Sequence, residues 1–147
     1  MPVSQNGAFR EIDGKVFTLK PRDYVVVIPH TGVAGSTAVA NINIDPSSIF
    51  IMTDRAMSDT NDPTAAAPGL QGQYENSISI QDASNGYNWS NDFVPRSAFA
   101  RTREHGYRLP DEVVIAANTR LTVSIKEPAA GNLAGSTTVI LQGYSIY

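Results

Sequence analysis

The 147-residue chain contains no cysteine, so it has neither a disulfide framework nor a thiolate that could bind a metal or act as a nucleophile. It also lacks an apolar run close to the roughly 20 residues that cross a bilayer, and its N-terminus lacks the basic-then-apolar layout of a signal peptide. We therefore expect a soluble protein made in the cytosol. With 41% hydrophobic and 17% charged residues, the composition is that of a globular protein with a core of its own.

Compact catalytic motifs are also missing from the sequence. No serine lies in a G-x-S-x-G elbow, no glycine-rich loop has the P-loop form, and the two histidines, His30 and His105, lie far apart. A triad or a pair of acids assembled only in space stays open, so an enzyme of that kind is one alternative. The residues favour a non-enzymatic protein that holds no cofactor and no metal.

Alternation of apolar and polar residues is clearest between residues 107 and 127. Leu121, Val123 and Ile125 alternate with polar residues, and this period of two predicts a half-buried strand. The run EVVIA precedes it, and Asn118 between them suits a turn because asparagine tolerates left-handed backbone angles. The pattern predicts an antiparallel hairpin over residues 107–127.

The rest of the chain reads as further strands joined by turns. The run RDYVVVIP, residues 22–29, is apolar at consecutive positions and favours a strand covered on both faces. Strands are also expected at 38–45, 49–54, 77–81 and 137–147, with a hairpin turn at Ser84-Asn85-Gly86 and a polar loop at 54–73. About eight strands without helical periodicity predict an all-β, antiparallel, jelly-roll-like β-sandwich.

The first 20 residues differ from the remainder of the chain. Gly7 and Gly14 interrupt them and large apolar residues are few, which predicts a flexible N-terminal arm with at most a short strand near Val16. We expect residues 21–147 to form a single sandwich domain.

Residues 95–108 form the one segment with a strong charge bias, since four arginines there face a single acid, Glu104. Arginine suits interfaces because its planar fork bonds carboxylates in a bidentate way. The plain alternative is a solvated loop with weak surface pairs. The sharper hypothesis is that Arg101 and Arg103 contact an acidic neighbour, for example another copy of the chain through the acids of residues 54–62. The candidate interface residues are Arg96, Arg101, Arg103, Arg108, Asp54, Asp59 and Asp62.

Two other partners are disfavoured for these charged residues. The net charge of −3 and the lack of aromatic–basic alternation argue against nucleic acid. The spacing of the three acids fits no recognised calcium loop, which argues against a cofactor cation.

A family resemblance appears between Ile80 and Tyr144. A strand leads to SNGYNW, then to a Phe-Val-Pro stretch, an arginine-rich link, RLPDEVVIAANTRLTVSI, and a last strand TTVILQGY. This order resembles that of small jelly-roll virion proteins of tailed bacteriophages, of the capsid-decoration, cement or minor structural type. It covers a little under half of the chain and carries no residue-specific role. The resemblance implies a virion component, made in the host cytoplasm, that docks on the major capsid protein and on copies of itself as a homo-oligomer such as a trimer.

The rival from another class is a carbohydrate- or receptor-binding β-sandwich module. It would use Tyr87, Trp89 and the 54–73 loop, although the only tryptophan is expected first as a packing residue. A glycan array and a native mass would separate this interpretation from that of a virion protein.

Overall fold

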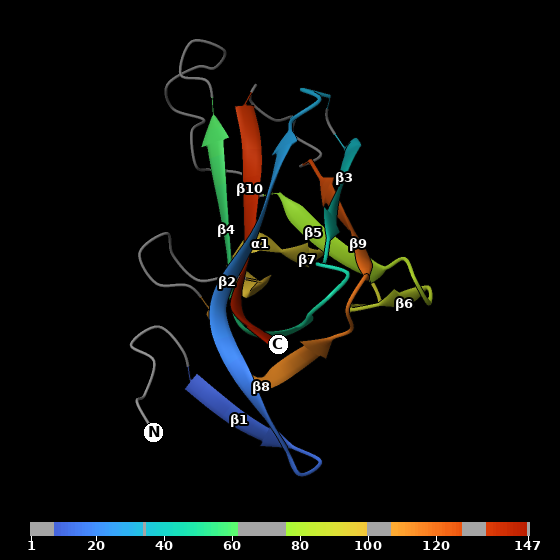
Figure 1. The fold of residues 1–147 in the computed structure, drawn as a ribbon. Coiled ribbons are helices and arrows are strands. Elements are labelled where there is room, and N and C mark those ends of the chain that lie inside the picture. The colour runs from blue at the N-terminus through green and yellow to red at the C-terminus, as the bar shows by residue number, and fades with distance from the viewer. Residues whose placement is uncertain (1–7, 34, 62–75, 100–106, 128–134, 147) are drawn as a thin grey trace.

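The computed structural model describes residues 8–33, 35–61, 76–99, 107–127 and 135–146, which form two antiparallel sheets packed face to face (Figure 1). The first sheet has the order β1-β2-β10-β4-β8, and the second has the order β3-β9-β5-β6 with β7 also paired to β5. The elements are β1 (Ala8–Ile12), β2 (Lys15–Pro29), β3 (Thr37–Asn43), β4 (Ile49–Asn61), β5 (Ser77–Asp82), β6 (Tyr87–Asn88), β7 (Val94–Pro95), α1 (Arg96–Phe99), β8 (Tyr107–Ile115), β9 (Arg120–Lys126) and β10 (Gly135–Ile146). The predicted all-β sandwich is confirmed.

The strand order is that of a jelly roll. Strands that follow one another in the chain mostly lie in opposite sheets, so β10 lies between β2 and β4, and β9 lies between β3 and β5. The four-stranded sets β2-β10-β4-β8 and β3-β9-β5-β6 then correspond to the eight strands of a double Greek key. The short strands β1 and β7 are additions at the margins, and α1 is a single helical turn.

The predicted hairpin over residues 107–127 is wrong, because its two strands lie in different sheets. β8 pairs with β4, whereas β9 pairs with β3 and β5. The turn is where the sequence predicts it, with Asn118 at a φ of 59°. It bonds to the β3–β4 connection: the Asn118 N–H donates to the Asp45 carbonyl (3.1 Å), and the Ile44 N–H donates to the Thr119 carbonyl (2.8 Å). These bonds anchor the turn where the chain crosses from one sheet to the other.

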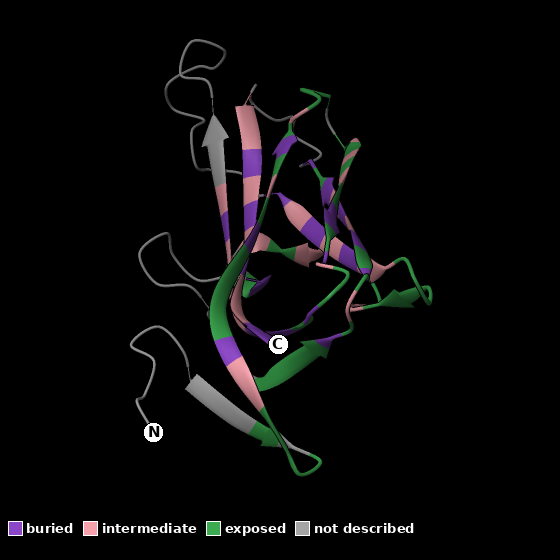
Figure 2. Ribbon diagram, in the orientation of Figure 1, coloured by how far each residue is buried: buried purple, intermediate pink, exposed green. Residues whose placement is uncertain are grey.

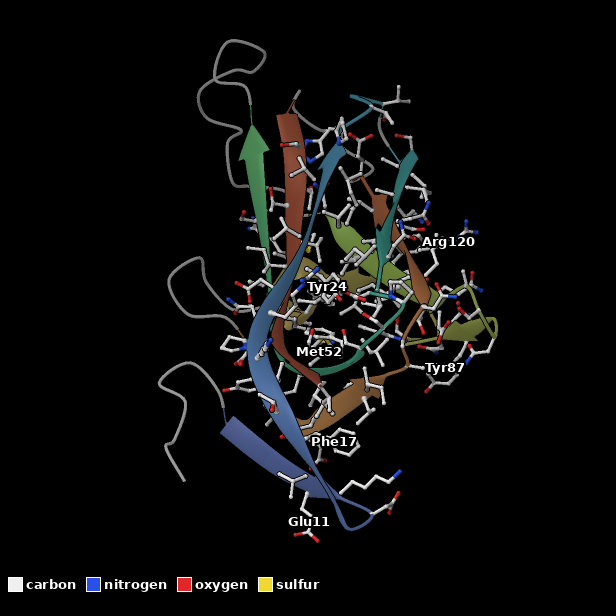
Figure 3. The ribbon with its side chains drawn as sticks, viewed as in Figure 1. Glu11, Phe17, Tyr24, Met52, Tyr87 and Arg120 are labelled. Atoms are coloured by element: carbon white, nitrogen blue, oxygen red, sulfur yellow. The ribbon has the colours of Figure 1, made fainter. Side chains whose placement is uncertain are left out.

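The main core lies between the sheets and follows the period-two pattern. Leu121, Val123 and Ile125 of β9 are each 0% exposed, as their alternation predicts. Figure 3 shows Tyr24 and Met52 directed into the same space from the first sheet. This apolar burial is the dominant favourable term for the fold.

β4 extends to Asn61, so the loop expected from residue 54 begins later than predicted. Each residue from Asp54 to Asn61 pairs with β10, ending with Asn61 opposite Gly135. The backbone hydrogen bonds to this long strand hold the segment extended although its side chains are mostly polar. Residues 62–73 of the expected loop lie outside the described residues.

Part of the expected N-terminal arm belongs to the first sheet. β1 pairs with the start of β2 through a turn that contains Gly14 at a φ of 76°. Leu19 is buried and packs with Ile51 and Ile146 in a second, smaller apolar cluster. The predicted boundary after residue 20 therefore lies inside β2, and residues 1–7 lie outside the described residues.

Candidate functional site

The outer face of the first sheet carries apolar side chains at its centre. Val25 and Val27 of β2 are 56% and 54% exposed, and Val25 lies level with Ile140 of β10 and Ala56 of β4. Directly opposed residues of antiparallel strands share a face, so these four residues form one patch, which we call the outer row. Figure 2 shows much of β2 as exposed. The expectation that both faces of residues 22–29 are covered is wrong for the outer row.

An open groove of about 220 Å³ lies beside the outer row, where the register between β4 and β10 shifts. In the register, Asp23 and Asp54 flank Gln142, so the groove has an acidic rim. Gly143 is required there, because a Cβ would lie 1.8 Å from the Ile51 carbonyl oxygen. The groove is lined by Pro21, Asp23, Thr53, Asp54, Gln142, Gly143 and Tyr144.

The candidate interface residues from the sequence fall in several places. Asp54 lines the groove, and the backbone of Arg108 in β8 lies directly opposite it in the sheet. Asp59 lies farther along β4, opposite Thr137, and Arg96 begins α1. The structure therefore shows that the backbones of Asp54 and Arg108 are paired within one chain, while the contact between copies stays a prediction. Outside the described residues lie Asp62, Arg101 and Arg103.

A buried polar cluster, which the sequence patterns did not predict, lies around Glu127 after β9. The Glu127 side chain is 2% exposed, and its carboxylate accepts hydrogen bonds from the Ser36 hydroxyl (2.5 Å), the Thr31 hydroxyl and the Gly32 N–H (3.1 Å). Burial raises the pKa of Glu127, but these hydrogen bonds lower it by more, so the pKa lies below its ordinary value. The cluster ties the β2–β3 connection to the end of β9.

A second group of polar residues lies on the neighbouring strand ends. His30 Nε2 lies 2.7 Å from Thr137 Oγ1, and Asn76 Nδ2 lies 3.1 Å from each of those two atoms. These contacts join the His30 ring to a threonine hydroxyl and an amide, and the His30 charge also contributes to lowering the pKa of Glu127. Among the residues that the structure describes, no three His, Cys, Asp or Glu side chains are grouped to hold a metal ion.

One sequence signal could have located the Glu127 cluster. Glu127 continues the buried alternation of Leu121, Val123 and Ile125, so an acidic residue occupies the next inward position of the same pattern. An acid in a core position needs hydrogen-bond donors nearby. The serine and threonine of the 31–36 segment are those donors.

A small cavity of about 100 Å³ lies between β4 and β5, next to α1. Trp89 lines it and packs partly buried against the main core, which agrees with the packing role expected of the only tryptophan. Tyr87 is instead 65% exposed, and Figure 3 shows it at β6, away from the core. The cavity is lined by Arg55, Ile78, Ile80, Trp89, Ser90, Val94 and Phe99.

Comparison with known proteins identifies no family for this chain: no protein-family model matches it, and no curated protein matches it. Within the described parts of the chain, no helix is both long and apolar enough to span a membrane. Function is therefore inferred from the geometry of the chain itself.

Proposed function

We propose that this chain is a non-enzymatic structural component of a bacteriophage virion, of the capsid-decoration, cement or minor head type, that docks on the particle and on copies of itself. The resemblance in strand order and turn chemistry suggests the virion, and the jelly-roll topology is compatible with it. The same fold also occurs in lectins and cupins, so the fold alone assigns no function. The observation that carries a docking role is the outer row.

The outer row has the character of an interaction surface. Single apolar residues scattered on a surface are normal and need no explanation. Val25 and Val27, however, are grouped with Ile140 and Ala56 on the open face of a sheet, as at an interaction site. Covering a half-exposed valine stabilises a complex by about 1 kcal/mol, since full burial of such a side chain is worth roughly 1.5–3 kcal/mol. A partner that covers the whole row would gain several such contributions.

The acidic groove beside the row can orient that partner. Charged groups at the edge of an interface contribute more to specificity and association rate than to affinity. Asp23 and Asp54 would select a partner that presents a basic side chain next to an apolar patch. The position of Asp54 in the groove agrees with the hypothesis from the sequence that the acids of residues 54–62 contact arginines of a partner.

The test is a pair of matched variants. The double change V25S and V27S removes the apolar surface of the outer row, and V39S removes an equally exposed valine (56%) from β3 in the other sheet. Sedimentation velocity should show that the double variant loses association with copies of the chain or with phage particles, whereas V39S keeps it. Circular dichroism should show a β fold for both.

The virion assignment needs its own measurement. Mass spectrometry of particles purified from the phage that encodes the chain should detect it in a fixed ratio to the major capsid protein. Its absence from purified particles would contradict the virion role, even if the outer row mediates self-association.

A carbohydrate- or receptor-binding module is the second candidate, and the exposure of Tyr87 at the start of β6 favours it. Exposed aromatic rings present an apolar face together with a polar group. If a monomer of the chain binds a glycan on an array, and Y87A abolishes that binding, the module replaces the virion protein as the better explanation.

A further inference from the structure

The long strand β2 has a different neighbour on each of its two sides. Residues 15–19 pair with β1 on one side, and residues 19–29 pair with β10 on the other. Among the described strands, none pairs with residues 22–29 on the side away from β10. We call this stretch of β2 the open edge. It belongs to the margin of the first sheet, where Figure 1 shows β2 next to β10.

The hydrogen bonds of β2 show which backbone groups point to the open edge. The His30 N–H donates to the Gly135 carbonyl (2.9 Å), and this pair continues the register in which Pro29 lies opposite Ser136. Along an antiparallel pair of strands, residues that exchange hydrogen bonds alternate with residues that do not. Every second residue before His30 therefore bonds to β10, and the residues between direct their N–H and C=O groups to the open edge. These residues are Asp23, Val25, Val27 and Pro29.

The two prolines of β2 agree with this assignment. Proline has no N–H, so in sheets it occupies positions that do not donate to a neighbouring strand, such as the outward positions of an edge. Pro21 and Pro29 both fall in the set that points away from β10, so neither removes a hydrogen bond of that pairing. The donors of the open edge are then the N–H groups of Asp23, Val25 and Val27.

The open edge lacks the features that usually keep sheet edges from pairing with another chain. Charged residues, prolines within the strand and irregular pairing give such protection. At the other margin of the same sheet, β8 contains Pro110 and two acids, and its pairing with β4 is irregular there. Residues 24–28 of β2 are instead an apolar run in regular register with β10.

The open edge is complementary to a second copy of itself. When two such edges pair antiparallel about a two-fold axis, residues with groups that point outward lie opposite one another. With Val25 opposite Val27 of the second copy, these two residues exchange hydrogen bonds, and the Asp23 N–H reaches the Pro29 carbonyl of the second copy. This register also pairs β-branched side chains on the outer face, which is stabilising. A register shifted by two residues puts Asp23 opposite Val27, or places its N–H beyond the end of the second β2.

We propose that two copies of this chain pair through their open edges, so that their first sheets form one continuous antiparallel sheet. Val26 of one copy then lies opposite Val26 of the other, at the two-fold axis. The pairing uses both open edges, so it closes as a dimer. The two outer rows become one surface that stays available to a further partner. The inference deepens the self-association of the proposed function, on which it rests, and does not use the virion role.

Sedimentation velocity across a range of protein concentrations measures the pairing. The wild-type chain should pass from monomer to dimer as the concentration rises, because residues 22–29 are fewer than the roughly 20–30 residues a side of a standard interface. V25P removes one donor of the open edge and no hydrogen bond to β10. V25T is the matched control, since it changes the same side chain and keeps the N–H.

The comparison of the two variants is decisive for the edge. V25P should weaken dimerisation by at least about tenfold relative to V25T, because the two-fold axis removes each lost hydrogen bond twice. Circular dichroism should show a β fold for both variants. Equal dimerisation of V25P and V25T would overturn the proposal. A wild-type chain that stays monomeric at every concentration would overturn it too.

Cysteine cross-linking tests the register, and the chain has no cysteine of its own. In the proposed dimer, the two Val26 residues form a pair without mutual hydrogen bonds, with Cα atoms about 4.5 Å apart, a distance that a disulfide spans. Mild oxidation of V26C should therefore give a covalent dimer. V39C, on the edge strand β3 of the second sheet, is the control and should cross-link at least about tenfold more slowly. Equal rates would refute the register, and if V25P does not fold, this comparison still decides.

The outcomes separate this inference from the proposed function. Self-association that V25P leaves intact would rule out the open edge as the interface and would leave the docking role of the outer row in place. A chain that is monomeric but present in purified particles would rule out the dimer and keep the virion role.

Discussion

The two faces of the first sheet are built from similar residues but differ in what covers them. On the inner face, Val139 and Leu141 of β10 are 0% exposed, whereas Val25 and Val27 on the outer face of β2 are more than half exposed. The second sheet covers only the inner face. The apolar content of a strand thus indicates how much surface it could bury, but the packing of the whole chain decides which face is buried.

The largest expected effect comes from neighbouring residues on opposite faces of β10. L141A should lower the free energy of unfolding by about 2–5 kcal/mol, because it leaves a cavity in the main core. I140A, one residue earlier and facing outward, should cost clearly less. Urea unfolding followed by circular dichroism measures both. Equal losses would mean that another part of the chain covers the outer face.

The next effect concerns the register shift that forms the groove. G143A places a Cβ 1.8 Å from the Ile51 carbonyl oxygen, so the backbone of β4 or β10 must move. We expect a loss of about 1–3 kcal/mol, as for overpacked sites. G14A is the control, since a Cβ there meets nothing within 4 Å and only the positive φ is strained. If G143A is as stable as the wild type, the backbone around the register shift can move to accommodate the added methyl group, and the shape of the groove is not fixed.

A smaller loss of stability is expected from a change at Glu127, at the polar end of the core, than from a change at its apolar centre. The pKa of Glu127 is lower in the folded chain than its ordinary value, so its contribution to stability is complete above about pH 4.5 and is lost as the pH falls through the folded pKa. E127Q should cost about 1–2 kcal/mol at neutral pH, because hydrogen bonds to a charged acceptor are the stronger ones. The difference between E127Q and the wild type should shrink in acid. A difference that is constant from pH 7 to pH 3 would contradict this account.

The smallest effect is expected on the outer row itself. V25T keeps the β-branched shape and should change the stability of the isolated chain by no more than about 0.5 kcal/mol, because the side chain is 56% exposed. The same change should weaken association with a partner if the outer row is an interface. A large loss of stability in the monomer would show that Val25 is covered within the chain, and the contrast between the two faces would then disappear.

Local patterns predicted the elements well where one face of a strand is buried. The alternation in residues 121–125 predicted the inward face of β9, and the Ser84-Asn85-Gly86 turn joins β5 to β6 as expected, with Gly86 at a φ of 73°. These features depend on backbone angles and on a period of two, which neighbouring residues determine. The candidate site was predicted less well: Asp54 lies in a groove, no local pattern pointed to Arg55, and the alternation of β9 marks Glu127 as an inward residue without identifying its hydrogen-bond donors.

The sequence by itself determined the fold class, the inward residues of the central strands and the position of the Asn118 turn. Only the tertiary structure decided that β8 and β9 pair with different sheets, because the hydrogen bonds of Asn118 and Thr119 reach the β3–β4 connection, which is distant in the chain. The same holds for Arg55 and Glu127, whose surroundings come from segments that are far away in the sequence. Long-range pairing brings such residues together, and no local period in the sequence records it.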